Sequence, residues 1–529
     1  MRGVTKNRSR WGRTALGTLC GLLAGYAALA VAELVAAAVR PESGPVVAVG
    51  ATAIDRTPDA LKEWAIRHFG TDDKLVLQLG ILGVLAVLAM ALGVLALRFR
   101  RAGAAGVLVF GVVGALAATG RPDSRGAVDA LPSVFGAVAA AGLLYWLVGK
   151  LPADRSAAAA GGSWDRRGFV IAATAAAAAS TGAGLLGRAV NGSSGQGAVA
   201  SRGTVVLPRP ASPAAPVPAA ASLQVPGLSP LFTPNDDFYR VDTALVVPKV
   251  NAATWRLEIH GEGVTRPRTI AFDDLLRGRA GELIERDVTL ACVSNEVGGP
   301  YVGNARWIGV RLADLLNSCG VRPPSRGGSA DQLVARSVDG MTIGTPVEAV
   351  MDGRDAMLAV GMNGQPLPFA HGFPVRMVVP GLYGYVSACK WIADMELTTF
   401  AAYDAYWVQR SWAQQAPVKT QSRIDTPKPF ARPKRGTVMV AGVAWAQHRG
   451  IARVEVRVDD GPWQQARLAA EDTVDTWRQW SFAWRATTSG SHTLTVRATD
   501  GTGTAQPEQR TPTVPNGASG WHSVIVNVG

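Results

Sequence analysis

The stretch TLACVSNEVGGPYVGNARWIGV, residues 289–310, ends a short apolar run with a cysteine and continues into a polar, glycine-rich loop. An apolar run of this length predicts a buried strand, so we expect Cys292 where a strand gives way to a loop. The chain has only four cysteines, namely Cys20, Cys292, Cys319 and Cys389. They form no CxxC pair and no CxxCH motif, so the sequence has no local signature of covalent haem, a thiolate zinc site or an iron–sulfur cluster. They also form no disulfide framework.

Around this stretch, residues 223–415 mix strand and helix patterns. TWRLEIHGEGV alternates apolar and polar residues, as a half-buried strand does. FPVRMVVPG, residues 373–381, predicts a second apolar strand. GTPVEAVMD predicts a helix in which Thr345 is the N-cap and Glu348 completes a capping box. These patterns predict an α+β domain.

Residues 416–529 show a different pattern of apolar and polar residues. RVEVRVDDGPW, HTLTVRATDGTG and WHSVIVNV each alternate apolar and polar residues, and turn signals separate them. Strands of period two joined by turns predict an immunoglobulin-like β-sandwich.

Residues 1–187 are rich in Ala, Leu, Val and Gly, and they contain five apolar segments. The segments are roughly 14–39, 75–97, 102–119, 131–149 and 168–187. Each is long enough, or nearly so, for a helix that crosses a hydrocarbon core of about 30 Å. We therefore predict an α-helical, multi-pass membrane region with about five transmembrane helices. None of the six histidines lies within these segments, which argues against a membrane haem held by this chain.

Basic residues precede the first segment, follow the second and lie between the fourth and fifth. If every segment spans the bilayer, all three groups fall on one side, which the positive-inside rule makes the cytoplasm. The N-terminus is then cytoplasmic and everything after residue 187 is extracytoplasmic. The paired Arg166 and Arg167 before the fifth segment also suit a twin-arginine export signal over residues 163–187, and both interpretations stay open. Residues 188–222, rich in Ala, Pro, Ser and Gly, predict a semi-extended linker.

The net charge is +13. Lys and Arg form no stripe interleaved with aromatic residues, and several flank the apolar segments instead, so we expect no binding to nucleic acid.

A set of motifs in residues 230–529 resembles the sulfite-oxidase family of molybdopterin-dependent oxidoreductases. The motifs are PNDDFYRVDT, TLACVSNEVGG with ARWIGVRLADLL, MNGQPLP, HGFPVRMVVPGLYG, ACKWI and GVAWAQHRGIARVEV. Their order and spacing together carry the resemblance, which leaves out the membrane region. It implies molybdenum held by a single molybdopterin and by one protein thiolate.

On that resemblance Cys292 is the metal ligand, although a buried cysteine can also serve packing alone. The residues that the resemblance implies at the cofactor are Phe238, Tyr239, Arg240, Asn295, Asp339, His371, Arg376 and Lys390. Arginine and lysine suit the cofactor's phosphate and pterin edges. For the basic residues the alternative is ordinary surface charge.

The chain departs from sulfite oxidases where those enzymes gather arginines and a tyrosine around the metal. Glu296 and Val297 stand where a basic residue is expected, and Trp412 replaces the tyrosine. The stretch before the final Trp-His has no arginine in the expected place. An acid would repel the sulfite dianion, so we expect another, less anionic substrate. Glu296 and Trp412 are the further catalytic candidates; Glu296 suits a proton donor or a solvated loop charge equally well.

The leading hypothesis is a membrane-anchored, extracytoplasmic oxidoreductase that transfers an oxygen atom and two electrons. Its electron partner would be a separate protein, either a cytochrome or a quinone-linked membrane subunit, and a homodimer is possible. Two alternatives remain. One is a quinone-pool-linked reductase of S-oxides or N-oxides, and the other is a non-catalytic, membrane-anchored binding protein with a decayed enzyme domain.

Overall fold

The computed structural model describes residues 2–58, 61, 68–69, 73–121, 123–151 and 166–529. Residues 163–165, which begin the predicted twin-arginine segment, lie outside these ranges. The chain divides into two compact units. One comprises Met1–Gly197 with Thr243–Val247, and the other comprises Ala198–Asp242 with Pro248–Gly529. Each unit is described by itself.

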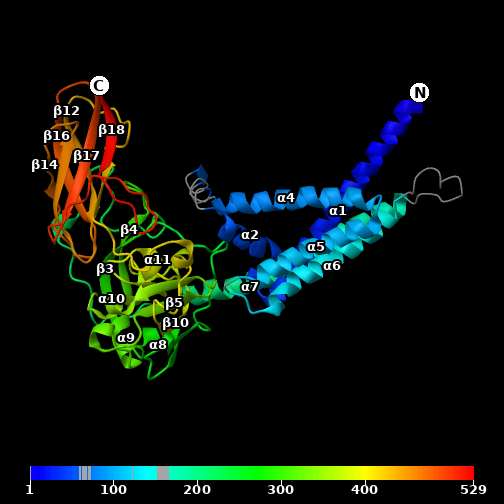
Figure 1. Ribbon diagram of the computed structural model, residues 1–529, viewed down its shortest axis with the longest axis horizontal. Coiled ribbons are helices and arrows are strands. Elements are labelled where there is room, and N and C mark those ends of the chain that lie inside the picture. The colour runs from blue at the N-terminus through cyan, green and yellow to red at the C-terminus, as the bar shows by residue number, and fades with distance from the viewer. Residues whose placement is uncertain (1, 59–60, 62–67, 70–72, 122, 152–165) are drawn as a thin grey trace. The chain divides into compact units, whose positions relative to one another are not determined.

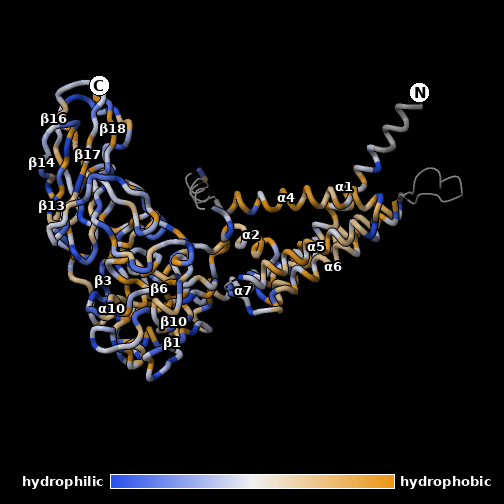
Figure 2. The backbone as a smooth tube through the Cα atoms, in the orientation of Figure 1, coloured by the Kyte–Doolittle hydropathy of each residue, from blue (hydrophilic) through white to orange (hydrophobic). Residues whose placement is uncertain are grey.

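The first unit is helical (Figure 1). Its helices are α1 (Arg2–Val39), α2 (Pro45–Arg56), α4 (Asp73–Ala96), α5 (Arg100–Thr119), α6 (Leu131–Gly149) and most of α7 (Arg166–Gly203), whose residues from Ala198 onward belong to the second unit. Five helical stretches are long and apolar enough to cross a membrane: Trp11–Val39, Leu75–Ala96, Arg100–Thr119, Ala127–Gly149 and Arg167–Gly203. Figure 2 shows the hydrophobic colour along α4, α5 and α6. The five predicted apolar segments thus correspond to five helices.

Small residues let these helices approach one another closely. A Cβ added at Gly93 of α4 would lie 2.1 Å from the carbonyl oxygen of Gly17 in α1. A Cβ at Gly136 of α6 would lie 2.6 Å from the carbonyl oxygen of Ala28 in α1. In apolar lipid there is little hydrophobic driving force for helix association. Van der Waals contact between backbones at small residues therefore contributes much of the stabilisation.

The predicted linker differs from the structure over its first part. Helix α7 continues to Gly203, because the first proline able to oppose a helix is Pro208 and helical hydrogen bonding propagates readily along an alanine-rich segment. Beyond the helix the chain follows the edge of a sheet. Ala211 donates its N–H to Leu283 O at 2.9 Å, and Ser212 O accepts from Glu285 N at 2.8 Å. This part of the chain is extended, as predicted, but it packs on the domain.

The second unit begins with an α+β domain built on two five-stranded sheets (Figure 1). One has the order β2-β1-β10-β5-β6, and the other has β3-β4-β7-β8 with β9 also paired to β7. The strands are β1 (Arg256–Gly261), β2 (Arg268–Ala271), β3 (Leu283–Ala291), β4 (Val302–Arg311), β5 (Gln332–Ser337), β6 (Thr342–Pro346), β7 (Met357–Met362), β8 (Gln365–Pro366), β9 (Arg376–Val378) and β10 (Ile392–Thr398). The short helices are α8 (Phe272–Leu276), α9 (Leu312–Ser318), α10 (Val347–Met351) and α11 (Gly384–Ser387). The α+β prediction is confirmed.

Two local predictions in this domain are wrong in detail. Thr345 is not an N-cap, because strand pairing with Leu333 places it in β6, where its hydroxyl donates to Val386 O. Glu348 does not close a capping box; its carboxylate accepts from the Ser325 hydroxyl at 2.6 Å. Of the predicted strand at 373–381, only the three residues of β9 pair with β7.

The C-terminal part is a β-sandwich of two four-stranded sheets, ordered β11-β12-β16-β15 and β14-β13-β17-β18. The strands are β11 (Gln421–Thr426), β12 (Gly436–Trp445), β13 (Ile451–Val458), β14 (Gln464–Gln465), β15 (Arg467–Leu468), β16 (Arg478–Ala486), β17 (Gly490–Asp500) and β18 (His522–Val528). Val454, Val456 and Trp480 lie fully buried between the sheets. The alternating patterns therefore predicted this sandwich correctly.

Candidate functional site

Cys292 lies one residue beyond β3 and is buried. Its N–H donates to Tyr301 O at 2.9 Å, and its carbonyl oxygen accepts from Asn295 N at 3.1 Å. These two bonds close the loop after β3 into a compact turn. The predicted strand-to-loop position of this cysteine is therefore the observed one.

Burial raises the pKa of the Cys292 thiol, because a buried thiolate loses its hydration. Hydrogen bonds from Ser294 and the positive charge of Lys390 oppose that rise. A bound metal cation would stabilise the thiolate far more strongly than these neighbours do. Without a metal ion, burial therefore favours the protonated thiol, whereas a bound metal ion would favour the thiolate.

Asn295 supplies the first sign of a missing binding partner. The residue is only 3% exposed. Its side-chain oxygen Oδ1 accepts a hydrogen bond from Tyr301 N at 2.8 Å. Its Nδ2 has no hydrogen-bond partner among the residues that the structure describes. A buried donor left unpaired costs about 1–3 kcal/mol, which indicates that another molecule satisfies it.

Phe238 and Tyr239 form an aromatic wall beside the cysteine loop. Phe238 stacks on Tyr239 with ring centroids 5.2 Å apart and meets His371 edge-on at 5.6 Å. Strand β4 passes so close that a Cβ at Gly303 would lie 2.8 Å from the Phe238 ring. Burial raises the pKa of the Tyr239 hydroxyl, and Cys292 adds to that effect. The hydroxyl therefore stays protonated and can donate.

His371 is neutral at physiological pH. Burial, followed by the charge of Arg376, lowers its pKa to about 4. Its Nε2 lies 2.9 Å from Asn235 O, and a carbonyl oxygen can only accept, so Nε2 carries the proton. Nδ1 is then a hydrogen-bond acceptor, available to a pterin N–H.

Arg376 in β9 is only 5% exposed. Its guanidinium donates to His371 O and Ala388 O at 3.3 and 3.5 Å, and it lies 5.1 Å from the centre of the Trp307 ring. Its Nε is buried and, within the described part of the chain, has no partner. Burial lowers its pKa to about 10, so it remains charged. A buried charge with an unused donor marks an anion or acceptor site.

Lys390 and Arg240 meet at a carboxylate that the sequence analysis did not single out. Asp242 Oδ2 lies 2.7 Å from Lys390 Nζ and 2.8 Å from Arg240 Nε. The Asp242 side chain is buried. Because one of its oxygens pairs with both cations, it keeps the Lys390 ammonium and the Arg240 guanidinium close together. The available signal was its position two residues after Arg240 in the DFYRVDT motif.

The pKa of Lys390 predicts a pH dependence. Burial lowers that pKa to about 8, so the ammonium charge, which would attract a phosphate, is present below pH 8 and is lost above it. We expect the affinity of the pterin-free protein for molybdopterin to fall roughly tenfold per pH unit above that value. Fluorescence titration between pH 6.5 and 9.5 measures this. Lys390→Arg should keep the affinity constant, and a wild-type affinity that is flat with pH would contradict the assignment.

The other three predicted residues lie at the margins of this cluster. Glu296 is on the exposed side of the cysteine loop. Trp412 is half-buried against Tyr385, with ring centroids 5.7 Å apart. Asp339 accepts from Met341 N in the turn between β5 and β6. Burial raises the pKa of Cys389, and the charge of Asp339 adds to that rise. The tight cluster therefore comprises the other eight predicted residues, with Asp242 added.

The β-sandwich holds the cysteine loop from one side. Gly298 has φ +79°, and a Cβ there would lie 2.3 Å from the His522 ring. Arg423 donates to Gly299 O at 2.7 Å. His522 in turn accepts from Ile424 N at 3.0 Å. The position of Cys292 thus depends on side chains more than 120 residues further along the chain.

Gly298→Ala tests this contact, and Gly327→Ala is the matched control. Gly327 has φ +80° but open space around its Cβ position, so both variants bear the same left-handed strain of roughly 1–2 kcal/mol. We expect Gly298→Ala to lose a further 1–3 kcal/mol or so of stability through overpacking against His522. Thermal unfolding of the full chain in detergent measures the difference. Equal unfolding midpoints would show that the loop does not depend on this contact.

Comparison with known proteins gives two family matches. Residues 244–407 match the oxidoreductase molybdopterin binding domain, and residues 421–496 match a bacterial Ig domain. Mitochondrial sulfite oxidase of Mus musculus is 30% identical over 347 residues, which cover 56% of this chain and 62% of that protein. Nitrate reductase [NADH] 1 of Oryza sativa subsp. japonica is 33% identical over 183 residues, covering 30% of this chain and 19% of that protein.

Among solved structures, the sulfane dehydrogenase SoxCD from Paracoccus pantotrophus has a TM-score of 0.47 and 24% sequence identity. The match covers 56% of this chain and 83% of that one. This chain spans less than two thirds of the length of the mouse sulfite oxidase.

The residues present suit molybdenum with molybdopterin. A buried thiol stands beside an unpaired amide donor, an unpaired guanidinium donor and two convergent cations. Soft thiolate is a ligand that a metal of this kind takes, and the cations match a phosphate. On this geometry and these matches, residues 244–407 form a molybdopterin-binding oxidoreductase domain that is similar to the corresponding part of sulfite oxidases.

Proposed function

We propose that this protein is a membrane-anchored, extracytoplasmic oxidoreductase that moves an oxygen atom and two electrons to or from a small substrate other than sulfite. One observation supports the chemistry best. Two buried donors, Asn295 Nδ2 and Arg376 Nε, are unpaired among the described residues and belong to the cluster around Cys292. An apolar or decayed site would have no reason to keep such costly groups.

In this proposal Cys292 ligates the metal, while Arg240, Arg376 and Lys390 hold the phosphate and the pterin edge. His371 accepts a pterin N–H at Nδ1, and Asn295 donates from Nδ2. When bound, the cofactor supplies the two-electron oxygen-transfer chemistry. The protein supplies orientation, positive charge and a dry aromatic wall at Phe238 and Tyr239.

The substrate proposal rests on charge. Glu296 lies in the loop of the metal ligand and is exposed, so an approaching dianion meets a negative group where a cation would help. Trp412 lies against Tyr385, and it presents a broad apolar surface where a tyrosine hydroxyl would be polar. Both features favour a less anionic substrate, which S-oxides and N-oxides exemplify.

The electrons require a separate partner. Among the described residues there is no group of three or more His, Cys, Asp or Glu side chains that could hold a further metal ion. A cytochrome or a quinone-linked membrane subunit therefore fits best. The membrane helices would keep the catalytic domain near that partner, with the N-terminus in the cytoplasm by the distribution of basic residues.

Substrate screening tests this proposal. Full-length protein from cells that make molybdopterin is assayed with sulfite, sulfoxides and N-oxides and an artificial redox dye. We expect at least one neutral oxide to have a higher kcat/KM than sulfite. Glu296→Arg should raise kcat/KM for sulfite roughly tenfold, equivalent to about 1.4 kcal/mol of transition-state stabilisation.

Glu262→Arg makes the same charge change at an exposed position in the turn after β1, so it controls for net charge. If the wild-type enzyme prefers sulfite, or if both arginine variants respond alike, the assigned role of Glu296 is wrong.

A further inference from the structure

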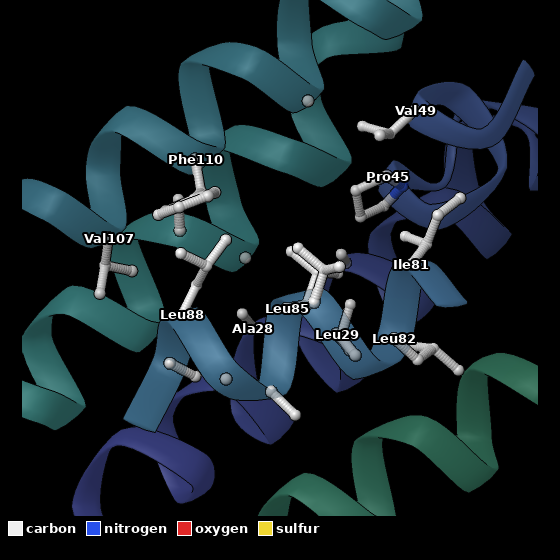
Figure 3. A pocket seen from close by; sticks show the side chains of 18 of the residues that line it. Ala28, Leu29, Pro45, Val49, Ile81, Leu82, Leu85, Leu88, Val107 and Phe110 are labelled. Atoms are coloured by element: carbon white, nitrogen blue, oxygen red, sulfur yellow. The ribbon is translucent and has the colours of Figure 1, made fainter. Parts of the chain in front are cut away.

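The helical unit contains a cavity of about 820 Å³, lined by α1, α2, α4, α5 and α6. Figure 3 shows Ile81, Leu85 and Leu88 of α4 along it, with Phe110 of α5 and Pro45 of α2 at different places on its wall. The lining on α4 runs from residue 76 to residue 92. At 1.5 Å per residue the cavity therefore extends along roughly 24 Å of helix.

The wall of this cavity is almost wholly apolar. Leu, Ile, Val, Phe and Ala side chains supply most of it, and small residues give it depth at Gly80 of α4, Gly111 and Gly114 of α5 and Gly136 of α6. Such a long apolar space suits a hydrocarbon chain better than water, because the wall offers water almost no hydrogen-bond partners.

Tyr26 of α1 and Ser133 of α6 bring hydroxyl groups to this wall, and the Tyr26 hydroxyl already bonds to Thr181 at 3.1 Å. Ser133 is 4% exposed and lines the cavity. Its Oγ lies 2.7 Å from the position that a Cβ would take at Gly114, which is another lining residue. In the described part of the chain this hydroxyl makes no hydrogen bond. A buried hydroxyl without a partner is costly, so an occupant with a hydrogen-bond acceptor would satisfy it.

The charges near this end of the bundle argue against an anionic headgroup. Arg40 at the end of α1 pairs with Asp123 and Asp129, both at 2.9 Å. Asp129 lies one helical turn before Ser133, and its side chain is fully buried. Arg121 also pairs with Asp123 at 2.8 Å. The two carboxylates therefore already balance both of these cations, which favours an uncharged polar head.

We propose that this cavity binds an isoprenoid quinone, with its chain along α4 and a ring carbonyl oxygen accepting from the Ser133 hydroxyl. The assignment of a quinone rather than another neutral lipid rests on the proposed function, since a quinone can carry both electrons of a two-electron oxidoreductase within the membrane. The proposal concerns binding within the helical unit of this chain, whereas the partner considered above is a separate protein.

The test uses the full-length protein solubilised from membranes that contain quinone. Bound lipids are extracted and quantified by mass spectrometry against the protein and its molybdenum content. We expect about one quinone per chain. Leu85→Trp fills the cavity and should lower the bound quinone at least tenfold. Val87→Trp places the same side chain on an exposed face of α4 outside the lining, and it should leave the quinone content unchanged.

Ser133→Ala probes the head contact separately. It should weaken the binding of added short-chain quinone about tenfold, measured by titration. Ser180→Ala, which changes a buried serine of α7 outside the cavity lining, should have no effect. If Leu85→Trp fails to fold, the comparison of Ser133→Ala with Ser180→Ala still tests whether the cavity binds quinone.

Recovery of phospholipid in place of quinone overturns the proposal, as does an equal response of the variants and their controls. Molybdenum and dye-linked turnover on the same preparations separate the two proposals. Protein that contains molybdenum but no quinone refutes only the quinone site. Protein that contains quinone but neither molybdenum nor turnover refutes only the proposed function.

Discussion

Cys292→Ser is expected to remove molybdenum from the protein and to lower turnover on the order of 1000-fold, or about 4 kcal/mol of transition-state stabilisation. The reason is that a serine hydroxyl has a far higher pKa than a thiol and is a harder donor, so it replaces the soft thiolate poorly. The thiol is buried within a closed turn. Elemental analysis and dye-linked turnover of the full chain measure both effects.

Cys319→Ala is the matched control. Cys319 is also fully buried, but it directly follows α9 and is neither a predicted cofactor residue nor a sequence neighbour of one. We expect this variant to lose some stability through a smaller core side chain and to keep its molybdenum. Full molybdenum content in Cys292→Ser would contradict the assigned metal ligand, whatever the activity.

Arg376→Lys is expected to lower the occupancy of molybdopterin about 10- to 100-fold, which corresponds to the 1.5–3 kcal/mol or so of hydrogen bonds made by a charged group. The guanidinium donates to His371 O and Ala388 O, while its buried Nε has no partner among the described residues. A lysine keeps the charge but loses the planar fork. Pterin released from the purified protein, oxidised and measured by fluorescence, gives the occupancy.

Arg311→Lys serves as the control for this change, because Arg311 forms a partly exposed pair with Asp355 at 2.6 Å. An exposed pair of that kind contributes roughly 0–1 kcal/mol, so its replacement should leave the pterin content unchanged. Equal occupancy in Arg376→Lys and the wild-type protein would show that charge alone suffices at position 376.

The candidate site was predictable because its residues lie in short motifs that keep their chemistry in sequence. The sequence alone shows Cys292 at the end of an apolar run. It also shows His371 and Arg376 on either side of the apolar residues FPV. Asp242 was not singled out, since an aspartate two residues from an arginine looks like a surface pair until burial is known. The roles of Glu296 and Trp412 remain predictions, because they depend on a substrate.

The local errors share one cause. Thr345 and Glu348 have the spacing of a capping box, but pairing of β6 with β5 takes Thr345 into a strand. The linker composition suggested an extended chain from residue 188, yet α7 continues to Gly203. In both places an interaction beyond the local pattern, a strand pair or a propagating helix, outweighs the small local preference.

By itself the sequence determined the architecture: apolar segments long enough for a membrane, an α+β domain and a sandwich of alternating strands. It determined these because hydrophobic period and segment length act locally along the chain. Only the tertiary structure decided which donors stay unpaired at Asn295 and Arg376, and which distant residue, His522, meets Gly298. Burial and close contact depend on how remote segments pack together, and no local pattern records that.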